Sequence, residues 1–475
     1  MRKTAVFAAV VFAALAAYEI VAASRAHMLL GDFRAFYCAG SAVLHGRDPY
    51  AAASLYACER ASAPFGLYGS PANLAVPAPL PGYALLLFVP LAALPYLGAS
   101  VLWTIVLAAA CGACVAALSH LVGRSVAAIV PVLAPALAIV ALPYGQLAAI
   151  EMLALLVLAL AARAQRWNVA ACAAAAAAVL PHVALPALAA AAVFCRPMRW
   201  RIAAVCALLV GLDVAAGGAG VAHEYFSAVL PAHALSEIAR TSQYGLSWVL
   251  YALGSGERPA LIAGQISYVL MALAGIAAAV RLAKQRADAA YAVLIPPAFA
   301  VFGGTFIHYT EIVAALPAAL LLYSGSRERF KPVFLTAAVL LALPWPLALN
   351  QPQLAAVFAV AGAAIACAYG RLPVRTAMFA GLACALAAAG IVYAGNHFGT
   401  GLGSQGTGAP LDASLAQASW AHYVRAHWSG TGPVWWIAKA PTWLGLLLLT
   451  VGCANAVAKK DFVLRVVIEH SPAAS

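Results

Sequence analysis

Long apolar runs recur along almost the whole chain, and they constrain its fold more than any other feature. Runs of about 17–25 residues can cross a hydrocarbon core about 30 Å thick as helices. They are rich in Ala and Leu and lack the alternating pattern of membrane β-strands. Apolar residues make up 65% of the chain and charged residues 9%, whereas soluble domains carry about a quarter charged residues. The sequence therefore predicts an all-α polytopic membrane protein.

The order of the runs predicts one membrane domain over residues 1–456, with about 12 to 14 spans, and a cytoplasmic tail over residues 457–475. The predicted spans are 4–23, 79–96, 97–119, 126–143, 147–162, 168–195, 202–222, 259–281, 289–305, 309–324, 332–349, 353–370, 375–393 and 434–456. Two long outer loops, 24–78 and 394–433, interrupt the series. We expect short interfacial helices in the outer segments, since aromatic residues gather there.

Basic residues are confined to short clusters between the runs. These clusters are 196–201, 281–286, 326–331, 371–375 and 459–460. With the basic N-terminus inside, they all fall on the cytoplasmic side, as the positive-inside rule requires. The net charge of +12 therefore belongs to membrane loops, and we expect membrane lipids but no nucleic acid as partners.

One basic cluster fits this topology poorly. The stretch RAQRW (163–167) falls outside in the alternation, and the long run after it is interrupted by Pro181 and Pro186. The run is either one kinked span or a re-entrant pair of half-helices with both ends inside. The second alternative requires another predicted span upstream to be broken. Non-helical backbone at membrane depth is found where it is buried in protein or lines a cavity.

The first outer loop concentrates charge within a chain that has little of it. The stretch LLGDFRAFYCAGSAVLHGRDPY (29–50) carries Asp32, Arg34, Arg47 and Asp48. A carboxylate at the start of an interfacial helix is either a functional group or a helix cap. The second half of the stretch is either a sugar-binding or phosphate-binding turn or a solvated one.

Cysteine and histidine residues add few strong signals. Cys38 and Cys58 share the first outer loop and can form a disulfide in an oxidising compartment. His182, at a Pro-broken helix, is either a phosphate ligand or a core hydrogen-bonding residue. His308, Tyr309 and Glu311 form a more polar cluster than helix packing requires and are candidate substrate contacts. No metal-ligand spacing is found, so we expect neither a metal nor a cofactor.

Six stretches spread over most of the chain, taken together, resemble a known family. They are GDFRAFYCAGSAVLHGRDPY (31–50), VPAPLPGYALLLFVPLAALP (76–95), PYGQLAAIEMLALLVLAL (143–160), VLPHVALPALAAAAVFCRPMRWR (179–201), TSQYGLSWVL (241–250) and FGGTFIHYTEIVAALPAALLL (302–322). Their order resembles that in the polyprenyl-phosphate-sugar-dependent glycosyltransferases of the GT-C superfamily. The resemblance is to glycosyltransferase family 87 in particular, a group of bacterial mannosyltransferases.

The resemblance implies a GT-C-like helical bundle in the bacterial cytoplasmic membrane, with its active site facing outside. A hexose, with mannose favoured, would pass from a polyprenyl-phosphate-sugar donor to a glycolipid or glycan acceptor, with inversion and without a metal. Asp32 matches the general base of the family, and His182 stands where the family usually has a lysine. The substrate-binding residues implied are Arg34, Tyr37, Arg47, Asp48, Tyr50, Gln146, His182, His308, Tyr309 and Glu311.

Two other classes of protein remain as alternatives. A transporter or flippase for a lipid or small solute also uses broken helices and buried polar residues. It would show internal repeats and charges at the membrane midplane, whereas the densest charge here lies at the outer interface. A non-catalytic membrane scaffold would not need the clustered Asp, Arg and Tyr. The sequence therefore favours the glycosyltransferase.

Overall fold

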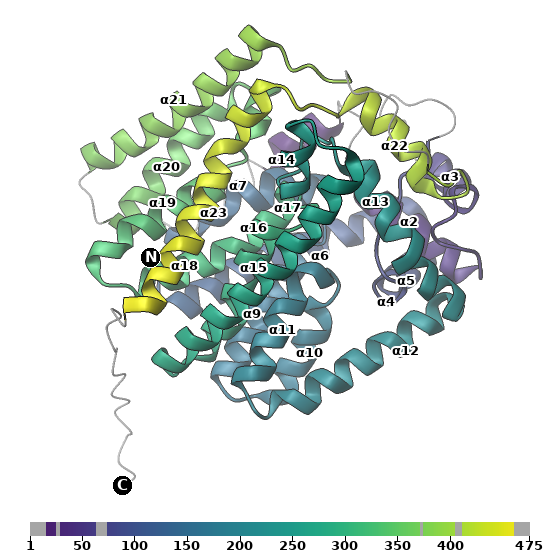
Figure 1. The fold of residues 1–475 in the computed structure, drawn as a ribbon, viewed down its shortest axis with the longest axis horizontal. Helices are drawn as coiled ribbons and strands as arrows, with labels where there is room; N and C mark the ends of the chain where they lie inside the picture. Colours follow the sequence, from purple (N-terminus) through teal and green to yellow (C-terminus); the bar gives the residue numbers. More distant parts are fainter. Residues whose placement is uncertain (1–15, 25–28, 63–73, 371–373, 404–410, 460–475) are drawn as a thin grey trace.

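A computed structural model describes residues 16–24, 29–62, 74–370, 374–403 and 411–459 (Figure 1). The described residues form helices joined by turns, with isolated β-bridges and no strand longer than these. Six described helices are long and apolar enough to cross a membrane. They are Tyr96–Val122, Val126–Tyr144, Met198–Glu237, Glu257–Arg286, Arg375–Phe398 and Pro433–Ala458. The prediction of an all-α polytopic membrane protein is confirmed.

The segment predicted as a span over residues 79–96 is instead a series of short turns. It contains α4 (Gly82–Leu85), a 3₁₀ turn and α5 (Val89–Ala92). Tyr37, on α2 (Gly31–Leu44), donates its hydroxyl to the Leu94 carbonyl at 2.8 Å, so the end of this segment lies beside the first outer loop. Pro79, Pro81, Pro90 and Pro95 explain the failure of the helix, because proline cannot donate the backbone hydrogen bond that helices need.

The run predicted as a single span over 168–195 is also divided. Helix α10 (Trp167–Ala177) and helix α11 (Pro181–Phe194) have 11 and 14 residues, too few to cross a membrane alone at about 1.5 Å per residue. Arg201, in the first turn of the helix that follows α11 (α12, Met198–Glu224), donates through Nε to Asn168 Oδ1 at the start of α10 at 3.2 Å, so the chain enters and leaves the pair at the same end. The re-entrant alternative is therefore the one that the structure supports.

Basic residues from several loops meet at one end of the bundle, which we call the basic end. Arg163 pairs with Asp288 at 2.6 Å between Nη2 and Oδ2, and its Nη1 donates to the Leu121 carbonyl. The Arg124 guanidinium lies over the rings of Tyr323 and Tyr369. The 163–167 cluster thus shares an end with the 281–286 cluster. The alternation had placed these two clusters at opposite ends, which is wrong because the broken 79–96 segment removes one crossing upstream of residues 163–167.

The remaining helices complete the bundle between this end and the opposite one. They are α6 (Tyr96–Val122), α7 (Val126–Ala136), α8 (Leu142–Tyr144), α9 (Ala148–Arg163), α12 (Met198–Glu224), α15 (Glu257–Arg286), α16 (Ala289–Gly303), α17 (Tyr309–Ile312), α18 (Leu316–Gly325), α19 (Lys331–Ala342), α20 (Leu354–Gly370), α21 (Val374–Phe398) and α23 (Pro433–Lys459). Helix α16 is buried along nearly its whole length, so it forms the centre of the packing. Helix α12 is mostly exposed and lies along one side (Figure 1).

The end of the bundle opposite the basic end, which we call the loop end, is covered by short helices. Helix α13 (Leu230–Glu237) packs against α22 (Ala416–His427), and α22 also contacts α3 (Ala52–Ala61), as Figure 1 shows. Helix α14 (Leu246–Ala252) packs on α15. Isolated β-bridges join Ala51 to Leu415 and Arg240 to Ser429. The two long outer loops are therefore packed together, and their predicted short helices are present.

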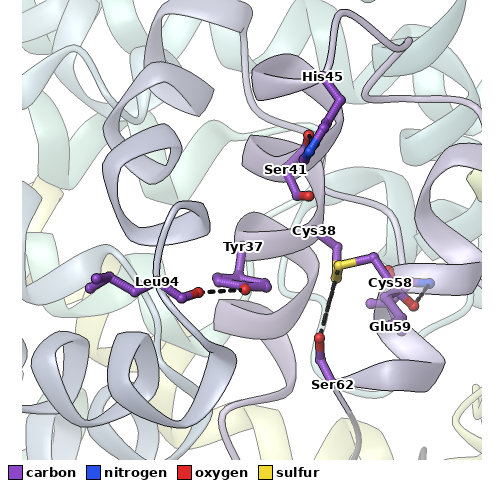
Figure 2. The surroundings of a disulfide bond; sticks show 9 residues. Tyr37, Cys38, Ser41, His45, Cys58, Glu59, Ser62 and Leu94 are labelled. Atoms are coloured by element: carbon purple, nitrogen blue, oxygen red, sulfur yellow. Dashed lines mark hydrogen bonds between the residues drawn. A yellow bond between two sulfur atoms is a disulfide. The ribbon is translucent and has the colours of Figure 1, made fainter.

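A disulfide joins Cys38 on α2 to Cys58 on α3, with the two Cα atoms 5.6 Å apart (Figure 2). This confirms the pairing that the sequence allowed. Helix α2 also packs against α4 and α5. The helix that begins with Gly31 and Asp32 is thus held at its middle by a covalent link and along its side by aromatic contacts.

Candidate functional site

Asp32 lies in the first turn of α2, after an unusual backbone conformation. Leu30 has a φ of 53°, in the left-handed region, which costs a residue with a Cβ about 1–2 kcal/mol. Its amide donates to the Pro143 carbonyl at 2.7 Å. This bond holds the start of α2 against the end of α8 and so fixes the position from which the Asp32 side chain extends.

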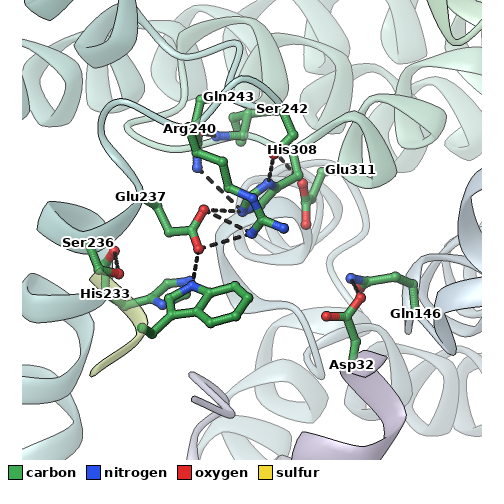
Figure 3. Close-up of polar contacts among 12 residues, drawn as sticks. Asp32, Gln146, His233, Ser236, Glu237, Arg240, Ser242, Gln243, His308 and Glu311 are labelled. Carbon is green, nitrogen blue, oxygen red and sulfur yellow. Dashed lines mark hydrogen bonds and ion pairs between the residues drawn. The ribbon is translucent and has the colours of Figure 1, made fainter. Parts of the chain in front are cut away.

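Gly145 allows the close approach that brings Gln146 to Asp32. The φ of Gly145 is 76°, and a Cβ at this position would lie 2.6 Å from Phe33 Cβ. Trp103 donates its indole Nε1 to the Gly145 carbonyl at 3.0 Å. Gln146 then donates its side-chain amide to Asp32 Oδ2 (Figure 3). The Gly-Gln pair in the sequence thus has two uses: the glycine makes room for α2, and the glutamine binds the carboxylate.

Burial raises the pKa of Asp32 to about 6 from its ordinary value of 3.8. The charge of Arg240 and the hydrogen bond from Gln146 lower the pKa, and the charge of Glu237 raises it. At neutral pH such a carboxylate is ionised yet more basic than an ordinary aspartate. This combination suits a group that removes a proton from a substrate.

A second cluster of polar side chains faces Asp32 and Gln146, as Figure 3 shows. It consists of Glu237, Arg240 and His308. Arg240 Nη1 donates to both oxygens of the buried Glu237, at 2.9 and 3.0 Å. The Trp420 indole donates to Glu237 Oε1, and His308 Nε2 lies 3.7 Å from Oε2. Arg240 also lies over the rings of Trp420 and Trp428. These aromatic residues of the last outer loop therefore point into the protein and not toward lipid headgroups, which corrects the expectation for this loop.

His308 is held by a close pairing of two segments. The Ile307 amide donates to Gln243 Oε1, and the Tyr244 amide donates to the Ile307 carbonyl, both at 2.8 Å. A Cβ on Gly245 would lie 2.5 Å from the Gly304 carbonyl oxygen, so glycine is required for this contact. Ser242 Oγ lies 2.9 Å from His308 Nδ1. The TSQYG and FGGTFIH motifs thus meet in space and position one histidine.

Two further histidines lie near His308 around the ring of Phe306. The His182 ring is stacked on Phe306 at 6.1 Å, and the His233 ring meets it edge-on at 5.1 Å. His182 Nε2 and His233 Nδ1 are buried and have no hydrogen-bond partner among the described residues. Both nitrogens are therefore available to a ligand, which favours the ligand interpretation of His182 over that of a satisfied core residue.

Tyr309 and Glu311 have local structural contacts. Glu311 Oε2 accepts a hydrogen bond from the His308 amide at 2.6 Å, which caps the start of α17. The Tyr309 hydroxyl donates to the Leu341 carbonyl at 3.3 Å. Glu311 lies close enough to Asp32 for the two carboxylates to repel each other. The structure thus brings Glu311 to the site, while Tyr309 packs behind it.

Arg34 is buried, with 4% of its surface exposed, and so does not lie among lipid headgroups. Its charge favours the ionised forms of both Glu59 and Asp32. Burial raises the pKa of Glu59 to about 8, even though the Val76 amide and Arg34 both favour its ionised form. The positive charge of Arg34 therefore influences two carboxyl groups, Asp32 in the site and Glu59 on α3.

The other candidates from the first loop lie apart from Asp32. The turn that contains Arg47, Asp48 and Tyr50 follows the far end of the 14-residue α2, about 20 Å along the helix axis from its start. Asp48 Oδ1 accepts from the Tyr50 amide at 2.8 Å, and the Tyr50 hydroxyl donates to the Leu80 carbonyl. Tyr37 packs on Phe33 and Tyr96. The structure does not bring these residues to the Asp32 carboxylate.

The sequence analysis did not identify His233, Glu237, Arg240 or Trp420 as site residues. A signal was present in PAHALSEIAR (231–240), where three ionisable side chains recur at intervals of four and three within a mostly apolar segment. This spacing places them on one face of a helix. Trp420 offered no such signal, because it reaches the site only through the packing of α22 on α13.

Three of these side chains can also hold a metal ion. One ligand atom each from His233, Glu237 and His308 lies within 4.8 Å of the other two. Motif spacing did not predict this set, because His308 is distant in the sequence from the other two residues. No other group of this kind occurs in the described part of the chain.

The fold and the site define a polytopic membrane protein whose polar side chains converge at one end of its helix bundle. The model of glycosyltransferase family 87 matches residues 81–303, so this part of the chain is similar to that family, and the similarity indicates a glycosyltransferase. The resemblance seen in the sequence is thereby confirmed. No curated protein and no solved structure matches the chain. Asp32, His308 and Glu311 lie outside the matched residues.

Proposed function

We propose that this glycosyltransferase moves a hexose, with mannose favoured, from a polyprenyl-phosphate-sugar donor to a glycolipid or glycan acceptor. The reaction inverts the anomeric centre, uses Asp32 as general base and requires no metal. The observation that carries the proposal is the environment of Asp32. Its carboxylate has a pKa raised to about 6 and one described hydrogen-bond donor, Gln146, and it faces the cationic Arg240.

In this mechanism Asp32 accepts the proton of the acceptor hydroxyl while that oxygen attacks the anomeric carbon. The bond from the sugar to the phosphate oxygen breaks on the opposite face, so the configuration inverts. A positioned base contributes about 10²–10⁴ in rate. Because a phosphate is a good leaving group, it needs stabilisation of its charge more than it needs a proton.

The residues that would receive this phosphate lie across from Asp32. Arg240 is cationic and is already fixed by Glu237. His182 and His233 offer buried ring nitrogens that lack a described partner. Burial lowers the pKa of His308 to about 3, so this imidazole is neutral and acts as a hydrogen-bonding group and not as a charge. Arg240 therefore supplies the positive charge, and the histidines orient the phosphate.

Two observations support an active site outside the bacterial cytoplasmic membrane. Asp32 and α13 lie at the loop end, which is separated from the basic end by the 30 residues of α15, about 45 Å of helix. Basic loops mark the cytoplasmic side. The Cys38–Cys58 disulfide belongs to the loop end, and such bonds persist in oxidising compartments.

Transfer by the purified protein tests the proposal. The full chain in detergent is incubated with synthetic polyprenyl-phosphate mannose or other hexoses and with candidate acceptors. The anomeric configuration of the product is then read by NMR. Wild type should transfer with inversion, Asp32→Asn should not, and Asp412→Asn, an exposed carboxylate in the last outer loop, serves as the matched control. Transfer at full rate by Asp32→Asn, or retention of configuration, would refute the mechanism.

The second candidate, a lipid transporter or flippase, is favoured by the broken re-entrant pair α10–α11. The same donor lipids, placed in proteoliposomes with the protein, separate the two functions. Movement of the intact donor across the bilayer without cleavage of its sugar–phosphate bond would support transport. Cleavage that depends on the acceptor supports transfer.

A further inference from the structure

We propose that His233, Glu237 and His308 form a binding site for a divalent transition metal ion of the zinc class. The site goes beyond the proposed function, and a metal bound there would inhibit sugar transfer without taking part in it. One ligand atom of each residue lies within 4.8 Å of the other two, and His233 and Glu237 are buried. Two ligands of one zinc ion are about 3.5 Å apart, given bonds of about 2.0–2.2 Å. Small side-chain rotations therefore suffice to close the site.

The backbone presents the three ligands from two independent elements. His233 and Glu237 are four residues apart on α13, so both side chains lie on one face of this helix. The bridge between Gln243 and His308 fixes the backbone of the third ligand. Contacts among the described residues therefore bring the three side chains together.

Hydrogen bonds around the ligands have the pattern found in metal sites. Ser242 Oγ at 2.9 Å can accept from His308 Nδ1, and Gln243 Nε2 lies 3.3 Å from His308 Nε2 as a donor. His308 Nε2 is then the acceptor nitrogen and lies 3.7 Å from Glu237 Oε2, and a metal ion that takes its lone pair replaces the hydrogen bond from Gln243. Metal-bound histidines characteristically donate their other ring nitrogen in this way. His233 offers one of its two ring nitrogens to the set, and its buried Nδ1 has no described partner.

The chemistry of the ligand set selects the metal. Two imidazole nitrogens and one carboxylate suit Zn²⁺, and also Co²⁺ and Ni²⁺, whereas Mg²⁺ and Ca²⁺ prefer sets made only of oxygen ligands. Three protein ligands leave a fourth tetrahedral position for a water molecule. Magnesium should therefore neither bind here nor compete with zinc.

Arg240 opposes the metal and thereby provides the sharpest test. Its Nη1 donates to Glu237 Oε2 at 3.0 Å, the oxygen nearest to His308. A metal that takes this oxygen displaces one hydrogen bond of Arg240 and is repelled by its charge. Removal of the guanidinium should therefore tighten metal binding, whereas a change that merely disturbed the fold would weaken it.

The inhibitory effect rests on the proposed function, while metal binding does not. The phosphate site proposed above uses Arg240, His233 and His308. A metal that engages both histidines and moves Arg240 would therefore compete with the donor. Zinc should inhibit transfer reversibly, and a chelator should restore the rate without raising it above that of the metal-free protein.

Titration of the tag-free full chain in detergent with Co²⁺ tests the site. We expect one equivalent, with the visible absorption of tetrahedral cobalt, displaced by Zn²⁺ and not by Mg²⁺. His233→Ala and His308→Ala should each weaken binding at least tenfold, and His223→Ala, an exposed residue on α12, should not. Arg240→Met should bind more tightly than wild type.

Two results would overturn the site. One is cobalt binding that persists unchanged in both ligand variants, and the other is binding that weakens in Arg240→Met. Circular dichroism of each variant checks that it is folded, and the Arg240→Met comparison still decides the question if a ligand variant unfolds. Metal binding in a protein that transfers no sugar would contradict only the proposed function. Transfer in a protein that binds no metal would contradict only this inference.

Discussion

Two carboxylates face Arg240, and their surroundings differ. Glu237 accepts hydrogen bonds from Arg240 on both oxygens and from the Trp420 indole, and it lies 3.7 Å from His308. Asp32 has one side-chain donor among the described residues, Gln146. The saturated carboxylate is a fixed counter-charge that holds Arg240 in place. The sparsely bonded one retains oxygen lone pairs for a substrate, and burial keeps it basic.

The largest expected effect is that of Asp32→Asn. We expect transfer to fall by about 10²–10⁴, the range for loss of a positioned base, while the protein becomes more stable near pH 7. The folded-state pKa is raised, so ionised Asp32 costs the folded state stability as pH rises from 3.8 through about 6. Above pH 6 this cost is at most about 3 kcal/mol. Thermal unfolding at pH 4 and pH 7.5 measures the gain, which should vanish at the lower pH.

The counterpart at the other carboxylate is Glu237→Gln. Since this change leaves Arg240 without its counter-charge, we expect a loss of about 3–5 kcal/mol in stability together with loss of transfer. Chemical unfolding in detergent measures this loss of stability, with Glu328→Gln at the basic end as the control. If Glu237→Gln were as stable as wild type, the contrast between the two carboxylates would not hold.

Loss of the Cys38–Cys58 disulfide in the first outer loop should have the next largest effect on stability. The disulfide closes a loop with a sequence separation of 20, and the double variant Cys38→Ser/Cys58→Ser should lose about 3 kcal/mol. Because α2 carries Asp32, the apparent KM for the acceptor should also rise. Wild type treated with a reductant should have the same stability and KM as the variant. A reductant that changes the stability of the variant but not that of wild type would contradict the assignment of the disulfide.

Glu59→Gln should change least, although Glu59 is as buried as Glu237. Burial raises the pKa of Glu59 to about 8, so at pH 7 it is already protonated and close in shape to glutamine. Stability should change by less than about 1 kcal/mol. The same variant measured at pH 9 should be more stable than wild type, because ionised Glu59 then costs the folded state. Equal stability at both pH values would show that Glu59 is ionised throughout.

Local sequence patterns were sufficient for part of this account. The helix that begins near Asp32 and the turn at Asp48 were predicted, and the Cys38–Cys58 disulfide was recognised as possible. Each depends on residues close together in the chain, whose conformational preferences are strong. The break at Pro181 was also recognised, although only contacts such as Arg201 with Asn168 chose the re-entrant arrangement.

The remainder of the site depends on contacts between distant segments. Arg240 acquires its position from Trp420 and Trp428, nearly two hundred residues away, and local preferences carry no information on such pairs. The same limit explains why the turn at Arg47 was wrongly grouped with Asp32. Its charges lie in one short stretch with Asp32, yet the helix between them separates the two groups. Closeness in sequence was mistaken for closeness in space.

The pH dependence of transfer tests the central claim, that Asp32 is the base, most directly. For wild type, kcat/KM should rise with pH and level off above an inflection near 6, where Asp32 loses its proton. The Gln146 hydrogen bond lowers the pKa of Asp32, so in Gln146→Leu the inflection should move to higher pH. An inflection that stays in place in Gln146→Leu, or a profile flat between pH 5 and 8, would contradict the assignment of Asp32.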